Sequence, residues 1–377
     1  MMRVLFVLLS LFSSFANAHS PACQQRHCVG IVDAGSTGSR LHLYAYNIDD
    51  NQTPIDIEQI WSKKTTPGFG SLDPDHVDTY LTNLFADAPE QNVPVLFYAT
   101  AGMRLVPQTR QQHLYQAVES WFTTHPEWRL QESKTISGKQ EGLFGWLAVN
   151  YKLGRLQADN KALVGVMDMG GASVQIVTPV EHTEAVDPKD TVILDLYTRH
   201  VTLFVHSFLG LGQTEVAHHY LNATHCFPYD YLLPNESLGE GDAQACQRDI
   251  SKLINSVHGV NQLVQPLLKA NPPTSWYAVS GLGYLARNKA FNFANHQFTN
   301  QDMLQQADNE FCHQLWPALN KQSEGNEYSF INCLSASYYY SLLVNGYGLQ
   351  PDQVINYMSD EEEPDWTIGV VLQQSKS

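Results

Sequence analysis

Short apolar runs alternate along the chain with turns rich in Gly, Ser and Thr and with longer segments of helical spacing. Residues 29–32 are apolar, which predicts a buried strand. The polar turn 33–40 joins this strand to a second one over 41–46, so the segment predicts a β-hairpin. A further buried strand is predicted over 93–98, and a helix is predicted over 107–124. The N-terminal part of the chain therefore has the mixed pattern of an α/β fold.

The hairpin pattern occurs a second time. A buried strand is predicted over 162–167, the Gly-rich turn 168–173 follows it, and another strand is predicted over 174–177. Each turn opens with an aspartate, and Asp33 and Asp168 stand 135 residues apart. The alternative is a chance similarity of two Gly-rich turns. We predict an internal duplication, which gives two α/β lobes packed face to face with a ligand cleft between them.

The rest of the chain continues the alternation of strand and helix patterns. No low-complexity linker separates the two copies of the hairpin. Helices are predicted over 139–151, 213–221, 243–257, 302–315 and 333–343, and strands over 192–196 and 276–280.

The first eighteen residues have the features of a secretory signal peptide. A basic start at Arg3 precedes the apolar segment 4–15, and an Ala-x-Ala cleavage site ends at Ala18. The apolar segment is shorter than the roughly twenty residues that span a bilayer, and no later apolar segment reaches that length. We therefore expect cleavage near Ala18, a secreted or periplasmic protein that begins near His19, and no membrane anchor.

Cysteine usage agrees with export to an oxidising compartment. The sequence has six cysteines and no C-x-x-C pair, which disfavours a zinc site and favours three disulfides. The alternative is that some of the cysteines are buried thiols. Since pairing between sequence neighbours closes short loops, we predict the bridges Cys23–Cys28, Cys226–Cys246 and Cys312–Cys333.

Composition narrows the classes of function. The 377 residues are 43% apolar and 16% charged, which allows a large core. At roughly 100–200 residues per domain, the length favours two domains. The 38 acidic residues outnumber the 22 basic ones, and no Lys/Arg run occurs, so nucleic-acid binding is not expected. Because the net charge of −16 repels a phosphorylated ligand, such a ligand would need a local binding arrangement.

The two Gly-rich turns have the composition of phosphate-binding sites. Glycines let backbone N–H groups converge on a phosphate, with Ser and Thr hydroxyls beside them. The lysine-bearing P-loop and the Rossmann glycine motif are both absent from the sequence. Asp33 and Asp168 are candidates for binding a divalent cation, because Mg²⁺ and Ca²⁺ prefer oxygen ligands. The alternative is that the two aspartates cap their turns by accepting backbone N–H groups.

Glu141 is the one carboxylate in residues 136–146, a segment of mostly small and apolar residues at the start of a predicted helix. A carboxylate in this position suits a general base that takes a proton from an attacking water. It would equally stabilise the N-terminus of the helix through the macrodipole. The segment alone leaves both interpretations open. The sequence lacks the nucleophile elbow of serine hydrolases and the zinc-protease motif.

Five segments, in this order along the chain, resemble the five apyrase conserved regions of the ecto-nucleoside triphosphate diphosphohydrolases (apyrases). The fifth segment departs from the family pattern, since Ile368, Gly369 and Val370 stand where the family has Leu-Gly-Ala. The family is a branch of the actin/Hsp70/sugar-kinase superfamily. The resemblance therefore implies two actin-like (RNase H-like) α/β lobes with the active site in the cleft between them. The five segments are Asp33–Arg40, Ala99–Arg104, Ile136–Trp146, Asp168–Gln175 and Asp365–Leu372.

The resemblance implies removal of terminal phosphates from nucleoside tri- and diphosphates down to the monophosphate, with Ca²⁺ or Mg²⁺. By matching position it makes Glu141 the general base, and Ser173 and Gln175 the residues that hold the nucleophilic water. Arg40 and Arg104 lie in the matching segments as further candidates for the site, and packing of their loops is an equal interpretation for both. Phosphate binding is implied for Gly35, Ser36, Thr37, Gly38, Thr100, Gly170, Gly171 and Ala172.

The resemblance also implies sites for the metal and for the nucleoside. Asp33, Asp168 and Thr100 would surround the hydrated metal, largely through water. The segment 209–215 is similar to a ribose-side segment of the family and contributes Gln213. The family often stacks the base between two aromatic side chains, for which Tyr328 and Trp366 are the candidates.

Animal cell-surface members carry terminal membrane helices, whereas no apolar segment of this chain has that length. The chain therefore looks more like the soluble secreted bacterial members. We expect a monomer with one lobe over 19–145 and 356–377 and the other over 146–355. An exopolyphosphatase on the same fold, or an actin-like nucleotide-binding module without turnover, is the alternative function. A binding site for the nucleobase would distinguish an apyrase from the exopolyphosphatase. The combination of Glu141, Ser173 and Gln175 argues against a module without turnover.

Overall fold

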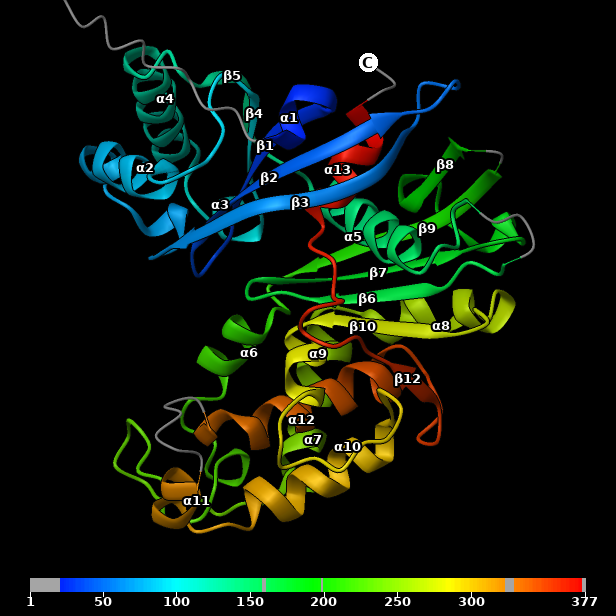
Figure 1. The fold of residues 1–377 in the computed structure, drawn as a ribbon. Coiled ribbons are helices and arrows are strands. Elements are labelled where there is room, and N and C mark those ends of the chain that lie inside the picture. The colour runs from blue at the N-terminus through cyan, green and yellow to red at the C-terminus, as the bar shows by residue number, and fades with distance from the viewer. Residues whose placement is uncertain (1–20, 158–160, 198, 323–328, 375–377) are drawn as a thin grey trace, which may run out of the picture.

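The computed structural model describes residues 21–157, 161–197, 199–322 and 329–374. The predicted signal peptide and Tyr328 lie outside these residues. Two β-sheets organise the chain into two α/β lobes, as Figure 1 shows, and the first sheet belongs to the upper lobe. Its strand order is β3-β2-β1-β4-β5, and its strands are β1 (His27–Ala34), β2 (Ser39–Ile48), β3 (Pro54–Thr65), β4 (Pro94–Ala99) and β5 (Arg129–Thr135).

The second sheet belongs to the lower lobe of Figure 1 and has the order β11-β12-β10-β6-β7-β9-β8. Its strands are β6 (Gly165–Met169), β7 (Ser173–Pro179), β8 (Thr191–Leu196), β9 (Arg199–Leu209), β10 (Trp276–Ser280), β11 (Gln297–Thr299) and β12 (Val354–Asn356).

The predicted duplication is present in the topology of the sheets. The order β3-β2-β1-β4-β5 has its counterpart in β9-β7-β6-β10-β12. In both sheets the first three strands pair antiparallel and the other two add in parallel. Asp33 pairs with Arg40 across the first hairpin, and Asp168 pairs with Gln175 across the second. The two aspartates therefore end equivalent strands of the two lobes.

Helices surround both sheets. Those predicted over 107–124 and 139–151 are confirmed as α4 and α5, and π-helical turns extend α7, α10 and α12 toward the longer predicted segments. The helices are α1 (Pro21–Gln25), α2 (Val77–Phe85), α3 (Ala101–Arg104), α4 (Gln108–Thr124), α5 (Gly138–Lys152), α6 (Gln213–His219), α7 (Ala243–Lys252), α8 (Val260–Ala270), α9 (Gly281–Ala286), α10 (Asn300–Ala307), α11 (Trp316–Gln322), α12 (Asn332–Tyr340) and α13 (Thr367–Gln373).

Two helices cross between the lobes. Helix α5 follows the last strand of the first sheet but packs on β6, β7 and β9 of the second, whereas α13 follows the second sheet and packs on β1 and β3. The two helices also pack on each other, and Figure 1 shows α5 between the sheets. Buried residues of both sheets join Trp146, Leu147 and Val371 in one apolar cluster. Because burial of apolar side chains is the main stabilising contribution, this shared core fixes the two sheets relative to each other.

Strand β3 was not predicted, and its irregular pairing explains why. Its residues are mostly half-buried or exposed, so its sequence lacks a continuous apolar run. The register with β2 shifts twice, between Leu43 and Tyr44 and between Ala45 and Asn47. Each shift breaks the two-residue alternation from which an edge strand is recognised.

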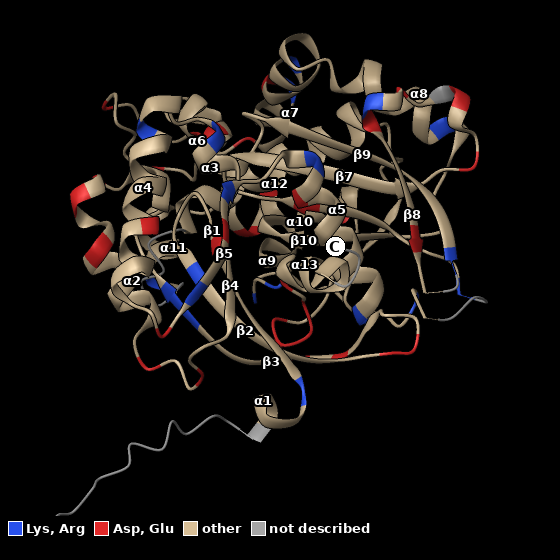
Figure 2. Ribbon diagram, turned by 90° about the horizontal axis from the view of Figure 1, so that it is seen from above, with Lys and Arg blue, Asp and Glu red and all other residues tan. Residues whose placement is uncertain are grey.

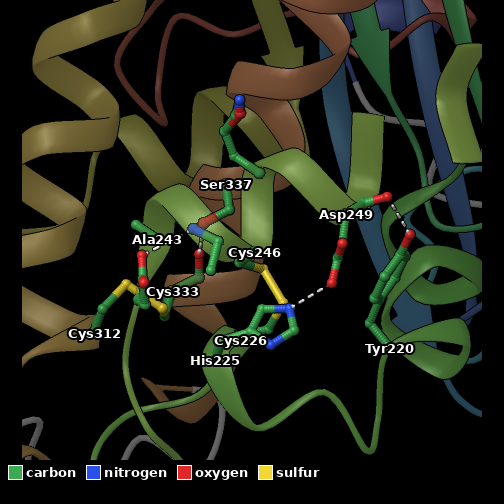
Figure 3. Close-up of a disulfide and its surroundings, with 12 residues drawn as sticks. Tyr220, His225, Cys226, Ala243, Cys246, Asp249, Cys312, Cys333 and Ser337 are labelled. Carbon is green, nitrogen blue, oxygen red and sulfur yellow. Dashed lines mark hydrogen bonds and ion pairs between the residues drawn. A yellow bond between two sulfur atoms is a disulfide. The ribbon is translucent and has the colours of Figure 1, made fainter. Parts of the chain in front are cut away.

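All three predicted disulfides are confirmed, and the described residues contain no free cysteine. Figure 3 shows the Cys226–Cys246 bridge, which joins the short 3-10 helix Thr224–Cys226 to α7 in the second lobe. Beside it, His225 forms an ion pair with Asp249 (Nε2–Oδ2 3.1 Å), and the Tyr220 hydroxyl donates to the Asp249 carbonyl (3.0 Å). Cys23–Cys28 joins α1 to β1 in the first lobe, and the other two bridges each join segments of the second lobe, so none of the three crosslinks the two lobes.

Among the residues that the structure describes, no helix combines the length and apolar character needed to cross a membrane.

Removal of single bridges should have graded effects on stability. Replacing Cys226 and Cys246 by Ala releases a loop with a sequence separation of 20 and should lower the free energy of unfolding by roughly 3 kcal/mol. The matched C23A/C28A variant releases a separation of 5 and should lose about 2 kcal/mol. Urea unfolding of the two variants measures the difference. An equal or larger loss in C23A/C28A would contradict this expectation, as would free thiols in the denatured, unreduced wild type.

Candidate active site

A cavity of about 550 Å³ lies between the lobes and is lined by residues of both hairpin turns. Almost all the predicted phosphate, metal and catalytic residues line it. Those residues are Asp33, Gly35, Ser36, Thr37, Gly38, Thr100, Glu141, Asp168, Gly170, Gly171, Ala172 and Ser173, together with Trp366.

The two turns approach each other across the cavity. The first is closed by a hydrogen bond from the Gly35 N–H to the Gly38 carbonyl (2.9 Å). A β-carbon on Gly171 of the second turn would lie 2.5 Å from the Ser36 hydroxyl oxygen, so a side chain there would collide with the first turn. A polyphosphate in this space would have backbone N–H groups on both sides.

Glu141 lies in the first turn of α5, whose start is capped. Ser137 accepts a hydrogen bond from the Gln140 N–H, and the Gln140 side chain accepts one from the Ser137 N–H. This capping box fixes the start of the helix. The Glu141 carboxylate is buried and forms an ion pair with Arg104 of α3. Arg104 therefore contacts the candidate general base directly.

Gln175 connects the candidate base to the residues around it. Its side-chain amide donates to the Ser173 hydroxyl (2.7 Å), and it lies 3.3 Å from a Glu141 carboxylate oxygen. The amide nitrogen also contacts the Ser207 hydroxyl of β9 (3.0 Å). The carboxylate, the amide and two hydroxyls thus form one buried polar cluster built from α5, β7 and β9.

The two hairpin aspartates line the cavity, Asp168 buried and Asp33 half-buried. One carboxylate oxygen of Asp33 is buried without a hydrogen-bond partner among the described residues. Thr100 follows β4, and its N–H donates to the carbonyl of Ala34 (3.2 Å). This bond brings Thr100 next to Asp33. Burial and the nearby Asp365 raise the pKa of Asp33 to about 7. Burial raises the pKa of Asp168 to about 6 against a hydrogen bond from Ser280.

Oxygen atoms dominate this end of the cavity. Within the described chain, no group of three or more His, Cys, Asp and Glu side chains could hold a metal ion directly. The free oxygen of Asp33 and the carboxylate of Asp168 remain available as acceptors. Such a donor set fits a hard cation that keeps several of its waters, which is the usual behaviour of Mg²⁺.

The segment between β12 and α13 forms another wall of the cavity. Figure 2 shows its acidic part as a red loop beside α9 and α13. On the second lobe, Arg287 pairs with Asp360 (2.6 Å) and with Glu363. On the first lobe, His42 of β2 pairs with Asp365 (3.1 Å). The segment is therefore held by charges at both ends as it passes from one lobe to the other.

In the His42–Asp365 pair the histidine is buried and the aspartate is half-buried. Burial raises the pKa of Asp365, but His42 and hydrogen bonds from Thr367 bring it below its ordinary value. The same partnership raises the pKa of His42, against the opposite effect of burial. An ionised Asp365 close to Asp33 disfavours ionisation of the latter, so a cation bound there would relieve the repulsion.

The residues predicted for the nucleoside are dispersed. Trp366 is 9% exposed, stacks on Phe144 (ring centroids 6.0 Å apart) and hydrogen-bonds to Asp33, at the phosphate end of the cavity. Gln213 does not line the cavity, and its side-chain oxygen accepts a hydrogen bond from Tyr339 (2.9 Å). Tyr328 lies outside the described residues. The lining aromatic with a free ring is Tyr284 of α9, which is 64% exposed.

Sequence reasoning missed Ser280, Tyr284 and Arg287. A signal for the first was available, because Ser280 ends the predicted strand 276–280 much as Thr100 comes just after the strand 93–98 of the first copy. Tyr284 and Arg287 had none, because their contribution depends on how α9 meets the segment before α13.

The whole described chain can be compared with known proteins. The family model of the GDA1/CD39 (nucleoside phosphatase) family matches residues 20–227 and 229–377. The nucleoside-triphosphatase of Pisum sativum is 28% identical over 90% of this chain and 86% of its own length. The ectonucleoside triphosphate diphosphohydrolase 1 of Bos taurus is 25% identical over 91% of this chain and 80% of its own length.

Solved structures share the fold at lower sequence identity. A nucleoside triphosphate hydrolase from Neospora caninum is 16% identical with a TM-score of 0.61, covering 93% of each chain. An exopolyphosphatase from Cytophaga hutchinsonii is 12% identical with a TM-score of 0.52, covering 93% of this chain and 98% of its own. These likenesses confirm the actin-like two-lobe fold. With the family model matching almost every residue after the first nineteen, the chain belongs to the GDA1/CD39 family of nucleoside phosphatases.

Proposed function

We propose that this protein is a secreted apyrase, which removes the terminal phosphates of nucleoside tri- and diphosphates by direct in-line attack of water. The observation that carries the proposal is the buried cluster of Glu141, Gln175 and Ser173, which borders a cavity between two phosphate-type turns. Serine and glutamine here orient a water for the carboxylate, which is the arrangement that general-base hydrolysis requires. No covalent intermediate is needed.

Each group has a separate task in this mechanism. Glu141 accepts the proton of the water that Ser173 and Gln175 hold, and Arg104 keeps the carboxylate in one orientation. The N–H groups of both turns donate to phosphate oxygens on either side of the terminal phosphorus. Asp33, Asp168 and Thr100 would hold Mg²⁺ or Ca²⁺ largely through water. When bound, that cation neutralises charge that develops on the transferred phosphoryl group.

The location of the protein is part of the proposal. The three disulfides agree with an oxidising compartment. Together with the sequence pattern of residues 1–18, they support a secreted or periplasmic protein.

An exopolyphosphatase is the second candidate, because the structure of one such enzyme shares the fold. A nucleotidase differs in needing a surface for the base. Tyr284 supports the nucleotidase, since its ring is exposed at the rim of the cavity and accessible for stacking. We propose Tyr284 for this role in place of Trp366, whose ring is already covered by Phe144.

Glu141→Gln should lower kcat for ATP by roughly 10²–10⁴, because the amide cannot accept the proton of the attacking water. Phosphate release measures the rate, and a thermal shift with ATP and Mg²⁺ checks that the nucleotide still binds. The exposed Glu119→Gln of α4 is the matched control and should keep wild-type turnover. Near-normal kcat in a folded Glu141→Gln protein would remove this residue from the mechanism.

The pH dependence should reveal an unusually weak acid. Burial raises the pKa of Glu141 from 4.5 to about 8, with Asp168 and Asp33 adding to the rise and Arg104 opposing it. Since the base acts only when ionised, kcat/KM for ATP should fall as the pH decreases, with its midpoint above 4.5. Bound Mg²⁺ should shift the midpoint downward, because a cation favours the carboxylate. A rate that stays constant down to pH 4.5 would contradict the assignment.

Tyr284→Ala should raise KM for ATP and GTP by roughly 5–150-fold, the range that corresponds to loss of one stacked base. Tyr284→Phe keeps the ring and is the matched control. Hydrolysis of tripolyphosphate, which has no base, should be almost unchanged. Equal losses with ATP and tripolyphosphate would show that Tyr284 is structural, and no loss with either would favour the exopolyphosphatase.

A further inference from the structure

Ser280 has a backbone conformation that L-residues rarely adopt. Its φ is +57° and its ψ is −129°, at the junction of β10 and α9. Glycine enters this region freely, whereas a β-carbon makes it costly. Nine other non-glycine residues of the described chain have positive φ, and none of them lines the cavity, whereas Ser280 does. Strained residues cluster at functional sites, so this one calls for a reason.

The space around the junction explains why the chain turns sharply here. The next residue is Gly281, where a β-carbon would lie 2.4 Å from both the Gln213 side-chain oxygen and the Tyr339 hydroxyl. The helix α9 therefore begins against a wall of side chains. Its first turn also has no room at Gly283, where a β-carbon would lie 2.7 Å from Glu363.

Two contacts of Ser280 use the strained geometry. Its N–H donates to a carboxylate oxygen of Glu363 (2.7 Å). Its side chain interacts with the Asp168 carboxylate and lowers the pKa of that group, and both residues line the cavity. The parallel pairing of β10 with β6 sets Val279 beside Asp168 and Ser280 beside Met169, so Ser280 lies next to the end of the strand that carries Asp168. Glycine at position 280 would keep the N–H contact and lose the strain. The β-carbon and the hydroxyl would both be missing.

We propose that Ser280 is a positioning residue, whose hydroxyl holds the Asp168 carboxylate toward the cavity in the orientation that a hydrated divalent cation requires. This inference rests on the proposed function, in which Asp168 contributes to a cation site. The strained backbone is what directs the hydroxyl at the carboxylate. Residues that orient metal-binding groups in this way typically change metal affinity or activity by about 10–100-fold when removed.

Two variants separate the hydroxyl from the strain. Ser280→Ala removes the hydroxyl and keeps the β-carbon, whereas Ser280→Gly removes both. Glu236→Gly is the matched control, because it introduces glycine at another positive φ (66°) on an exposed turn of the same lobe. Two measurements are made on each protein: the Mg²⁺ concentration for half-maximal ATP hydrolysis, and the melting temperature without nucleotide, with and without Mg²⁺.

Both Ser280 variants should need about 10-fold more Mg²⁺ than the wild type, and kcat at saturating Mg²⁺ should be largely restored. Ser280→Gly should melt at a higher temperature than the wild type without Mg²⁺, yet gain less from added Mg²⁺. A purely structural serine would instead change stability and leave the Mg²⁺ requirement alone. Glu236→Gly should keep the wild-type Mg²⁺ requirement.

An unchanged Mg²⁺ requirement in both Ser280 variants would overturn the inference, and so would a lower melting temperature for Ser280→Gly. Failure of the proposed function has a different signature, namely a wild type that does not hydrolyse ATP or does not respond to Mg²⁺. In that case the Mg²⁺-dependent melting shifts still decide the inference. Equal shifts in the wild type and the variants would refute it, and reduced shifts in the variants would support it.

Discussion

The removal of carboxylates from water at the cavity between the lobes is the constraint on which this structure depends. Asp33, Glu141 and Asp168 are taken out of water together, and the pKa of each is raised by burial as its first cause. Burying charge is costly unless it is paired. Arg104 forms an ion pair with Glu141, whereas one oxygen of Asp33 has no hydrogen-bond partner within the described part of the chain. The remaining negative charge favours binding of a cation. Until a cation binds, the surrounding fold has to keep the carboxylates in place.

The two lobes keep the site in place because each contributes a helix that packs on the sheet of the other. Helix α5, which carries Glu141, belongs to the first lobe by sequence but packs on the sheet of the second, and α13 makes the reciprocal crossing. The shared apolar core between the sheets therefore anchors the helix with the candidate base. The segment before α13 is tied to the first lobe by His42 and to the second by Arg287. Rigid positioning of this kind lowers the reorganisation needed during catalysis.

Local patterns made much of the site predictable. The repeated Asp-x-Gly turn gave both strand ends, because strand periodicity and glycine-rich turns are encoded in neighbouring residues. Glu141 was identified by its place in a helix start whose capping pattern is also local. Even the cysteine pairing followed from sequence proximity. Sequence alone could not choose between a base and a helix-stabilising charge for Glu141, since the choice depends on its contacts with Gln175 and Arg104.

Features created by the meeting of distant segments were not predictable. The strain at Ser280 arises where β10 ends beside β6, and Tyr284 reaches the cavity rim because of where α9 begins. Trp366 was a candidate for stacking the nucleobase by resemblance to the family, yet its ring packs on Phe144. A motif match does not reveal which side chain covers an aromatic ring in the folded protein.

The central claim is direct attack of water on the terminal phosphorus. The most direct test is the stereochemical course of hydrolysis, followed with an ATP analogue whose terminal thiophosphoryl group is made chiral by oxygen isotopes, in isotopically labelled water. A single in-line displacement predicts inversion of configuration at phosphorus. Retention would require two displacements through a covalent phosphoenzyme and would contradict the account.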